Sequence, residues 1–418
     1  MFFKPIEKFN LNPKAEGDKS LSHRLLIVAA LSKGKSVLQN ISLCRDVLTT
    51  VNCLITLGAK IKIIGKTAYV KPIINPPKSV ILDCQNSGTT ARLLAGAAAG
   101  IGVEAVFLGD KSLSKRPMNM LAALEEMGAQ IVMQEGALFK ILPSTLKAAD
   151  YTVKDNSAQT KSCVMLAALF AKGQSVIRED EKTRDHTERI LSFFAPSHSL
   201  IARDVGSVYI TPHVPLGKKV FIPNDISTAY YYMALAAFKG KTKVKKVLVN
   251  PLRTGFLRVL DSCGANVAIT SLKSNGFEEY ADITVKKSSL SPLKGFQEPL
   301  SALIDEVPLL CFLLANVNSA FEMEGLSRLA GKESNRIKST AEMLNSVGFD
   351  CGFSSDAIFC KGGENNGGAI KTYGDHRIAL TSAVIAALSK KGAEIDDVAC
   401  IGISSPASLK FIKRRIRG

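Results

Sequence analysis

Residues 25–37 read LLIVAALSKGKSV, an apolar helical run that breaks at Lys33 and Gly34 and passes into a strand-like stretch. Residues 46–61, DVLTTVNCLITLGAKI, add a second helix pattern that ends in a Gly-Ala turn before another strand. Periodic apolar residues favour helices, and glycine marks the point where a helix ends. The two stretches together predict a helix-strand-helix-strand unit of an α/β fold.

The same order recurs along the chain with a period of about 70 residues, which is longer than the repeats of common solenoids. A second copy is expected to have its helices at residues 93–99 and 118–127. Further first helices are expected at residues 164–171, 230–238, 307–316 and 378–389. Six units then fill the chain. The alternative interpretation is a chance recurrence of Ala-rich helices in an α/β protein.

Chain length and one short connection divide these units into two halves. A chain of 418 residues exceeds the usual size of a single domain. Pro215 and Gly217 lie in a basic connection between residues 212 and 223, with three units on each side. We therefore expect two domains of three units each.

The charge of the chain indicates anionic partners. A formal net charge of +17 fits nucleic acid, a membrane surface or anionic small substrates. With no Trp and 6% aromatic residues, the chain lacks the stacking residues that usually accompany basic ones in nucleic-acid binders. The longest weakly apolar run, residues 93–103, is too short to span a membrane. We expect neither partner, and a basic nucleic-acid-binding protein stays as the alternative from a different class.

Cysteine and histidine usage predicts neither a disulfide framework nor a metal site, and we expect no cofactor. Nine cysteines without a C-x-x-C pair and five histidines without an H-E-x-x-H motif match no common disulfide or metal-site pattern. Lys4 and Glu7 interrupt the apolar start before a signal sequence can form. We expect a cytoplasmic monomer.

Small polar residues and a cation precede four of the apolar helices. The segments read GDKSLSHR at 17–24, NSGTTAR at 86–92, NSAQTK at 156–161 and GDHR at 374–377. Free amide groups and the positive dipole end make helix starts natural anion sites, and Ser and Thr add hydroxyl donors. One such start would be an ordinary cap. Four of them, each with Lys or Arg, predict bound phosphate or carboxylate.

Within the first segment, Ser20 and Arg24 lie four apart and so share a helix face, and Lys19 projects from the turn before it. A single anion could touch all three. The pattern D-K-S-L-S-x-R returns at residues 110–116, followed by Pro117. Asp305 lies where the fifth-repeat helix is expected to begin. It is either a helix cap or a carboxylate that accepts a proton from a substrate hydroxyl, and both interpretations stay open.

Six motifs in a fixed order resemble those of the 5-enolpyruvylshikimate-3-phosphate synthases over residues 16–406. They are GDKSLSHR, NSGTTARL, SAQTKS at 157–162, TRDHTE at 183–188, GKESNR at 331–336 and GDHRIA at 374–379. The resemblance implies two domains of three βαβαββ units each, the pseudo-sixfold inside-out α/β barrel of the enolpyruvyl transferases. Residues 13–219 would form the upper domain and residues 1–12 with 220–418 the lower one, with the active site in the cleft between them.

The resemblance also implies the reaction and its residues. The enolpyruvyl group of phosphoenolpyruvate would pass to the 5-hydroxyl of shikimate 3-phosphate through a tetrahedral intermediate, a step in aromatic amino-acid biosynthesis. The implied acceptor ligands are Lys19, Ser20, Arg24, Ser157, Ala158, Gln159, Thr183, Asp305 and Lys332. The implied phosphoenolpyruvate ligands are Lys19, Gly88, Arg116, Gln159, Arg336 and Arg377. Lys19, Asp305 as proton acceptor and Glu333 as acid at the methylene carbon complete the implied catalytic set.

The chain departs from the family pattern at three positions. Glu16 stands where Pro is common and Asn335 where Asp is frequent, and Ile403 falls where some members place a phosphoenolpyruvate-binding Lys. The sister family, the UDP-N-acetylglucosamine enolpyruvyl transferases, has a G-C-x-x-G-x-R-P loop. Residues 109–117 here read GDKSLSKRP, without that cysteine, which favours the shikimate family.

Overall fold

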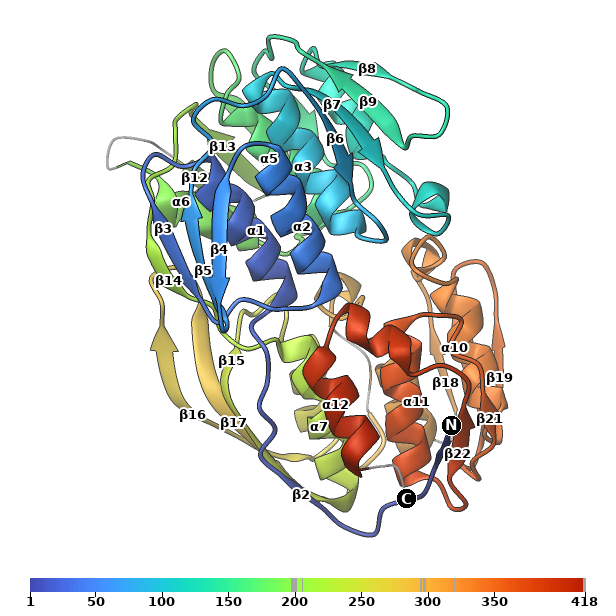
Figure 1. The fold of residues 1–418 in the computed structure, drawn as a ribbon. Coiled ribbons are helices and arrows are strands. Elements are labelled where there is room, and N and C mark those ends of the chain that lie inside the picture. The colour runs from blue at the N-terminus through green and yellow to red at the C-terminus, as the bar shows by residue number, and fades with distance from the viewer. Residues whose placement is uncertain (197–200, 205, 294, 296–297, 319, 416–418) are drawn as a thin grey trace. The chain divides into compact units, whose positions relative to one another are not determined.

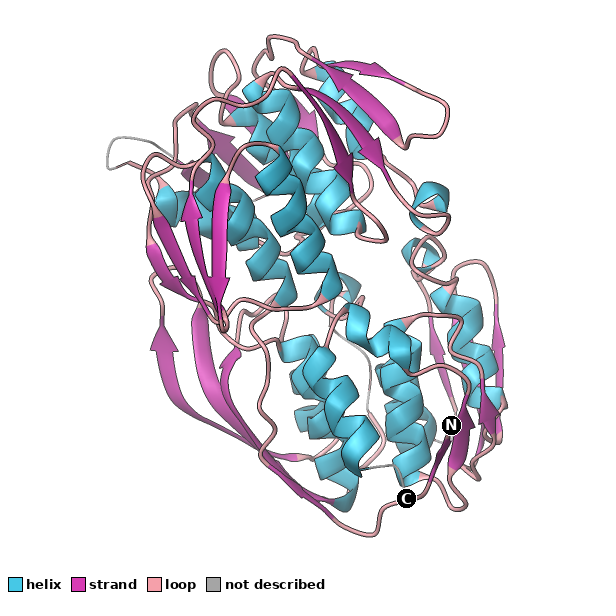
Figure 2. Cartoon of the chain, in the orientation of Figure 1, coloured by secondary structure: helices cyan, strands magenta, loops and turns pink. Residues whose placement is uncertain are grey.

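Six small sheets, each with its own helices, make up the part of the chain that the structure describes (Figures 1 and 2). This computed structural model describes residues 1–196, 201–204, 206–293, 295, 298–318 and 320–415. The chain divides into two compact units. Residues 17–222 with 275–278 form one, named here the Lys19 unit, and residues 1–16, 223–274 and 279–418 form the other, the Asp305 unit.

Three sheets and three helix pairs build the Lys19 unit. The helices are α1 (Lys19–Leu31), α2 (Arg45–Thr56), α3 (Gly88–Ile101), α4 (Met120–Glu126), α5 (Ala158–Ala168) and α6 (His186–Phe194). The strands are β3 (Ser36–Gln39), β4 (Lys60–Ile64), β5 (Thr67–Lys71), β6 (Ser79–Asp83), β7 (Glu104–Leu108), β8 (Gln130–Val132), β9 (Phe139–Leu142), β10 (Asp150–Thr152), β11 (Ser175–Arg178), β12 (Ile201–Asp204), β13 (Ser207–Ile210) and β14 (Lys219–Phe221). A 3₁₀ turn, η1 (Leu113–Lys115), precedes α4.

The Asp305 unit repeats this plan with some losses. Its helices are α7 (Ile226–Lys239), α8 (Gly255–Ser262), α9 (Val307–Val317), α10 (Arg336–Asn345), α11 (His376–Leu388) and α12 (Pro406–Arg415), with 3₁₀ turns η2 (Leu300–Ala302), η3 (Ser327–Leu329) and η4 (Ala399–Ile403). Its strands are β1 (Phe2–Phe3), β2 (Phe9–Leu11), β15 (Gly240–Leu248), β16 (Asn266–Ser274), β17 (Glu279–Lys286), β18 (Phe321–Met323), β19 (Phe349–Phe353), β20 (Ile358–Gly363), β21 (Ala369–Ile370) and β22 (Ala393–Ile395).

Four of the sheets share one strand order, in which a parallel pair is followed by an antiparallel hairpin. They are β14-β3-β5-β4, β6-β7-β9-β8, β10-β11-β13-β12 and β2-β15-β17-β16. The two remaining sheets, β18-β20-β19 and β1-β22-β21, have three strands each. The sixfold α/β repeat predicted from the sequence is therefore confirmed, with shortened fifth and sixth copies.

The first helix of each repeat forms the centre of its unit. In α1 every residue from Leu21 to Leu31 is buried, which explains why the part from Leu25 to Leu31 is apolar on all sides. Helix α3 packs against α5, and a Cβ added to Gly96 would lie 2.1 Å from the carbonyl oxygen of Cys163. Only glycine permits so close a crossing. In the Asp305 unit, helices α7 and α9 pack on α11.

Candidate active site

The start of α1 carries the first group of predicted ligands. Asp18 is the N-cap, and its side chain accepts a hydrogen bond from the amide of Leu21 at 2.8 Å. Lys19 is the first helical residue, and its Nζ lies 2.9 Å from Oδ2 of Asp46 on α2. No acidic residue follows in the first turn. Because the buried Asp18 carboxylate offsets the helix dipole, Lys19 has to supply much of the attraction for an anion here.

The second copy of this motif has the same local geometry without the helix. Asp110 accepts a hydrogen bond from the amide of Leu113 at 2.8 Å, three residues on, as Asp18 does. The chain then makes only the 3₁₀ turn η1, and Arg116 follows it. Arg116 donates from Nη2 to Oδ1 of Asn86 at 2.7 Å and from Nη1 to the carbonyl oxygen of Asn86 at 3.2 Å. A predicted phosphoenolpyruvate ligand thus lies beside the residues that lead into α3.

Helices α3 and α5 meet through Arg92, the cation of the predicted helix start at residues 86–92, which was not among the predicted substrate ligands. Arg92 donates from Nη1 to Oε1 of Gln159 at 2.7 Å and from Nη2 to the carbonyl oxygen of Pro117 at 2.9 Å. Gln159 in turn donates to Oγ1 of Thr89 at 2.9 Å. Arg92 follows Gly88 by four residues, so the helical spacing was the available signal. Arg92 thus ties Gln159, a predicted phosphoenolpyruvate ligand, to the helix that begins at Gly88, another.

The first turn of α5 holds three predicted acceptor ligands. Ser157 is the N-cap, and its hydroxyl accepts from the amides of Gln159 at 3.3 Å and Thr160 at 3.4 Å. Ala158 is the first helical residue. Thr183 is buried elsewhere in the same unit, where its hydroxyl donates to Oε2 of Glu179 at 2.6 Å.

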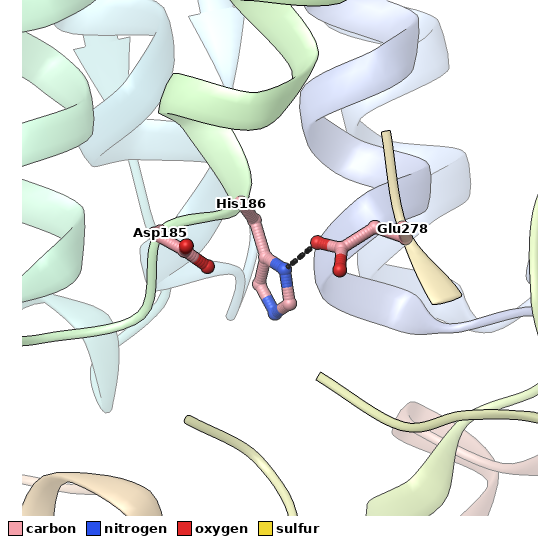
Figure 3. Close-up of side chains that lie close together, drawn as sticks. All are labelled: Asp185, His186 and Glu278. Atoms are coloured by element: carbon pink, nitrogen blue, oxygen red, sulfur yellow. Dashed lines mark hydrogen bonds and ion pairs between the residues drawn. The ribbon is translucent and has the colours of Figure 1, made fainter. Parts of the chain in front are cut away.

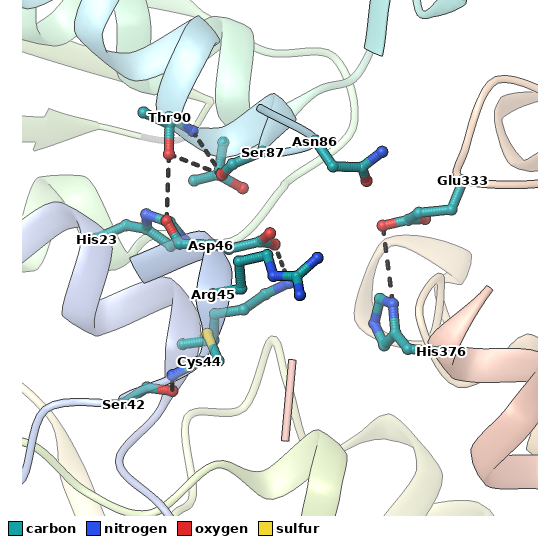
Figure 4. A network of polar contacts seen from close by, with 12 residues as sticks. His23, Ser42, Cys44, Arg45, Asp46, Asn86, Ser87, Thr90, Glu333 and His376 are labelled. Carbon is teal, nitrogen blue, oxygen red and sulfur yellow. Dashed lines mark hydrogen bonds and ion pairs between the residues drawn. The ribbon is translucent and has the colours of Figure 1, made fainter. Parts of the chain in front are cut away.

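A chain of buried polar groups links α1, α2 and α3 (Figure 4). Nδ1 of His23 lies 2.7 Å from Oγ1 of Thr50, and this hydroxyl lies 2.7 Å from that of Thr90. Thr90 also donates to Oγ of Ser87, the N-cap of α3, at 2.7 Å. Burial lowers the pKa of His23 well below its usual value, and the charges of Lys19 and Arg24 lower it further. His23 is therefore neutral near pH 7.

Four predicted residues of the Asp305 unit lie in one cluster of ion pairs. The buried guanidinium group of Arg336 contacts Asp375, Glu333 and Asp305. Burial alone would lower the pKa of Arg336, but these three carboxylates outweigh it and raise that pKa. Arg377 lies 3.9 Å from Oδ2 of Asp305 and 3.8 Å from Oε1 of Glu306. Asp305, Glu333, Arg336 and Arg377 are thus brought together, as expected of groups that serve one site.

Asp305 is not the cap of the helix that follows it. The N-cap of α9 is Glu306, one residue later, and its side chain makes no capping hydrogen bond. The carboxylate of Asp305 instead lies near two guanidinium groups, 3.5 Å from Nη1 of Arg336 and 3.9 Å from Nη2 of Arg377. The interpretation of Asp305 as a helix cap is therefore wrong, and its role as a proton acceptor stays a prediction.

Two further residues from the sequence analysis belong to the same unit. Lys332 is half-buried in the connection between η3 and α10, next to Glu333. Ile403 ends η4, half-buried against the apolar core of its unit. The side chain of Ile403 offers no group that could bind an anion. Asp375 was predicted only as part of the helix start at residues 374–377. Its ion pair with Arg336 was not predicted from the sequence.

Two groups of acidic and histidine side chains have a spacing that could suit a metal ion. One is Asp185, His186 and Glu278 (Figure 3), and the other is Glu333, Asp375 and His376. In the first, His186 Nδ1 lies 2.6 Å from Glu278, and Arg189 lies 2.7 Å from Asp185 and 3.9 Å from Glu278. In the second, Arg336 pairs with both carboxylates. A guanidinium group thus already supplies the positive charge in each.

Comparisons with known proteins agree with the motif set. Residues 4–410 match the family model described as EPSP synthase (3-phosphoshikimate 1-carboxyvinyltransferase). The chain belongs to the EPSP synthase family. Over 95% of its length it is 35% identical to the 3-phosphoshikimate 1-carboxyvinyltransferase of Clostridium tetani, of which 92% is covered. It is 34% identical to the protein of that name from Alkaliphilus metalliredigens, over 99% of both chains.

Comparison of the fold with solved structures also supports membership of the EPSP synthase family. A solved structure of EPSP synthase from Acinetobacter baumannii matches with a TM-score of 0.84 and 30% sequence identity, over 99% of this chain and 97% of that one. The family resemblance and fold class read from the sequence are confirmed. Within the described residues, no helix is long and apolar enough to span a bilayer.

Proposed function

We propose that this chain transfers the enolpyruvyl group of phosphoenolpyruvate to the 5-hydroxyl of shikimate 3-phosphate and releases phosphate. The observation that carries the proposal is the cluster of the Asp305 unit, in which a half-buried carboxylate lies near two buried guanidinium groups. Family membership and the relatives' names support the choice of reaction. We further propose that residues of both units serve this one reaction.

The charges of the substrates fit the predicted ligands. Phosphoenolpyruvate carries a phosphate and a carboxylate, and the acceptor carries the same two groups. Arginine suits such anions because its planar guanidinium group can donate two parallel hydrogen bonds. Arg116, Arg336 and Arg377 are proposed to hold phosphoenolpyruvate with Lys19, Gly88 and Gln159. Lys19, Ser20, Arg24, Ser157, Ala158, Gln159, Thr183, Asp305 and Lys332 are proposed to hold the acceptor.

The proposed chemistry is an addition followed by an elimination. Asp305 accepts the proton of the 5-hydroxyl while the hydroxyl oxygen of the acceptor bonds to C2 of the enol. Glu333 supplies a proton to the methylene carbon. The tetrahedral adduct then loses its phosphate as a proton leaves the new methyl group, which restores the double bond. Lys19 and the arginines stabilise charge that develops on the phosphate. The raised pKa of Arg336 keeps that group cationic throughout.

We also propose a monomer in the cytoplasm, with phosphoenolpyruvate and shikimate 3-phosphate as its only substrates. Nine cysteines with free, buried thiols support a reducing compartment.

The test is phosphate release by the purified chain. We expect release from phosphoenolpyruvate only when shikimate 3-phosphate is present, together with a product heavier by one enolpyruvyl group. UDP-N-acetylglucosamine serves as the control acceptor. Equal release with this control alone would overturn the proposal, and so would polynucleotide binding without any release.

A further inference from the structure

A fully buried lysine lies behind the predicted acceptor ligands of the Lys19 unit. Lys161 on α5 is 0% exposed, and its Nζ lies 2.6 Å from Oε1 of Glu188 and 2.9 Å from Oε2 of Glu179. Glu188 on α6 is itself 2% exposed. An ammonium group is costly to bury unless carboxylates compensate it. The reaction proposed above gives Lys161 and Glu188 no part.

The neighbouring residues on the same two helices form a second contact. Ser162 follows Lys161 and Thr187 precedes Glu188, and their hydroxyl oxygens lie 2.6 Å apart. We name these four residues, Lys161, Ser162, Thr187 and Glu188, the α5–α6 clamp. An ion pair and an adjacent contact between two hydroxyls therefore join the same turn of α5 to the same turn of α6. Paired contacts of this kind fix the position of one helix along the other.

The clamp holds Arg24 from two sides. Arg24 donates from Nε to Oγ1 of Thr187 at 2.8 Å and from Nη2 to Oγ of Ser162 at 3.0 Å. The Ser162 hydroxyl also donates to the carbonyl oxygen of Ala158 at 2.5 Å. Arg24 and the first turn of α5 are therefore both bonded to the Ser162 hydroxyl, and Arg24 is bonded to the Thr187 hydroxyl as well.

The ionic half of the clamp extends to a third predicted acceptor ligand. Glu179, the other partner of Lys161, accepts from the hydroxyl of Thr183 at 2.6 Å and from its amide at 3.1 Å. Among the polar groups in the described part of the chain, Oε2 of Glu188 is buried without a hydrogen-bond partner. This carboxylate is thus buried at a cost, and the ion pair that offsets the cost within the described residues is the one with Lys161.

The predicted donor ligands are held by a different set of contacts. Arg116, which is predicted to hold phosphoenolpyruvate alone, is fixed by Asn86, and Gln159, which is predicted to hold both substrates, is fixed by Arg92 and Thr89. Neither set of hydrogen bonds includes a clamp residue. A change in the clamp should therefore disturb the acceptor side more than the donor side.

We propose that the α5–α6 clamp is a positioning device for the acceptor, which orients Arg24, Ala158 and Thr183 without touching substrate. The inference rests on the proposed function, because it assigns these three residues to the acceptor. Wild-type turnover is therefore measured first. If the wild-type chain fails to turn over, the proposed function has failed; if it turns over normally, the variants bear on the clamp alone.

Two clamp variants are compared with two matched controls. Glu188→Gln removes the charge from the ionic contact, and Thr187→Val removes the hydroxyl that receives Arg24. Thr187→Ser keeps that hydroxyl. Glu104→Gln removes a carboxylate from a partly exposed pair with Lys140 in the same unit, at 2.7 Å. Steady-state kinetics give KM for each substrate, and thermal unfolding reports on folding.

We expect Glu188→Gln and Thr187→Val to raise KM for shikimate 3-phosphate by about tenfold and to leave KM for phosphoenolpyruvate within about twofold. Thr187→Ser and Glu104→Gln should leave both constants within about twofold. A purely structural role predicts a lower unfolding temperature with no difference between the substrates. That result, or an equal rise of both constants, overturns the inference. If Glu188→Gln does not fold, the comparison of Thr187→Val with Thr187→Ser decides whether the inference stands.

Discussion

The carboxylate of Asp375 holds the guanidinium group of Arg336 with two hydrogen bonds, from Nε to Oδ2 at 2.8 Å and from Nη2 to Oδ1 at 3.3 Å. The same carboxylate caps α11, because its Oδ1 accepts from the amide of Arg377 at 2.8 Å. One buried acid thus sets the position of two predicted phosphoenolpyruvate ligands. The family pattern names those arginines, and the structure adds the group that orients the first and starts the helix of the second.

Asp375→Asn should weaken both stability and donor binding. Loss of the charge leaves Arg336 paired only with the two half-buried carboxylates of the cluster. Breaking a buried ion pair typically costs about 3 kcal/mol. We expect a loss of that order in the free energy of unfolding, measured in urea, and a fall of about tenfold in kcat/KM for phosphoenolpyruvate. Asp397→Asn is the control, since Asp397 also accepts from a backbone amide, that of Ala399 at 2.7 Å, but is exposed. Equal effects of the two variants would contradict this prediction.

Asp305→Asn should abolish most turnover and spare binding. The amide keeps the shape of the carboxylate but cannot accept the hydroxyl proton at neutral pH. We expect kcat to fall by about a hundredfold or more, while the dissociation constant for shikimate 3-phosphate stays within about tenfold. Calorimetric titration measures the binding. Asp261→Asn, on an exposed position of α8, is the control; unchanged kcat in Asp305→Asn would exclude this residue as the base.

Gly88→Ala should selectively impair phosphoenolpyruvate binding. The added Cβ would lie 2.7 Å from Nη1 of Arg92, which is held by Gln159 and by the carbonyl of Pro117. One of these contacts has to shift, so we expect KM for phosphoenolpyruvate to rise by about tenfold and KM for the acceptor to change by less than about threefold.

Gly65→Ala provides the comparison for that variant. A Cβ at Gly65 meets nothing within 4 Å, although its φ of +59° makes the substitution strained. We expect lower stability and unchanged Michaelis constants in Gly65→Ala. If Gly88→Ala shifts both Michaelis constants together, the proposed route through Arg92 is wrong.

The buried His23 should make stability depend on pH below neutrality. Its folded pKa is lowered, first by burial and then by Lys19 and Arg24, whereas the unfolded value is about 6.5. The unfolded chain therefore binds more protons between the two values, and stability rises with pH through that window. The contribution is complete above about pH 6.5 and is lost as pH falls towards the folded pKa, at up to about 1.4 kcal/mol per pH unit.

His23→Gln tests this titration directly. We expect the variant to be less stable than wild type at pH 7.5, because the contact with Thr50 is weakened. Its urea midpoint should fall less steeply than that of wild type between pH 6.5 and 5. Parallel curves for the two proteins would show that another group governs this window.

Local patterns account for what the sequence could predict of the fold. The apolar helices, the glycine turns and the strand patterns of six repeats are all set by neighbours a few residues apart, so they can be read from the chain. The shortened fifth and sixth sheets were not foreseen. Strand pairing there depends on partners such as β1 with β22, which lie at opposite ends of the chain.

The same distinction between local patterns and distant contacts applies to the candidate site. By itself the sequence determined the sixfold α/β repeat, the helix starts with their cations, and the family to which the motifs belong. Only the tertiary structure decided which group holds each cation: Asp375 for Arg336, Gln159 for Arg92, and Glu188 for Lys161. The reason is physical, because helix patterns and caps depend on separation along the chain, whereas the compensation of a buried charge depends on separation in space.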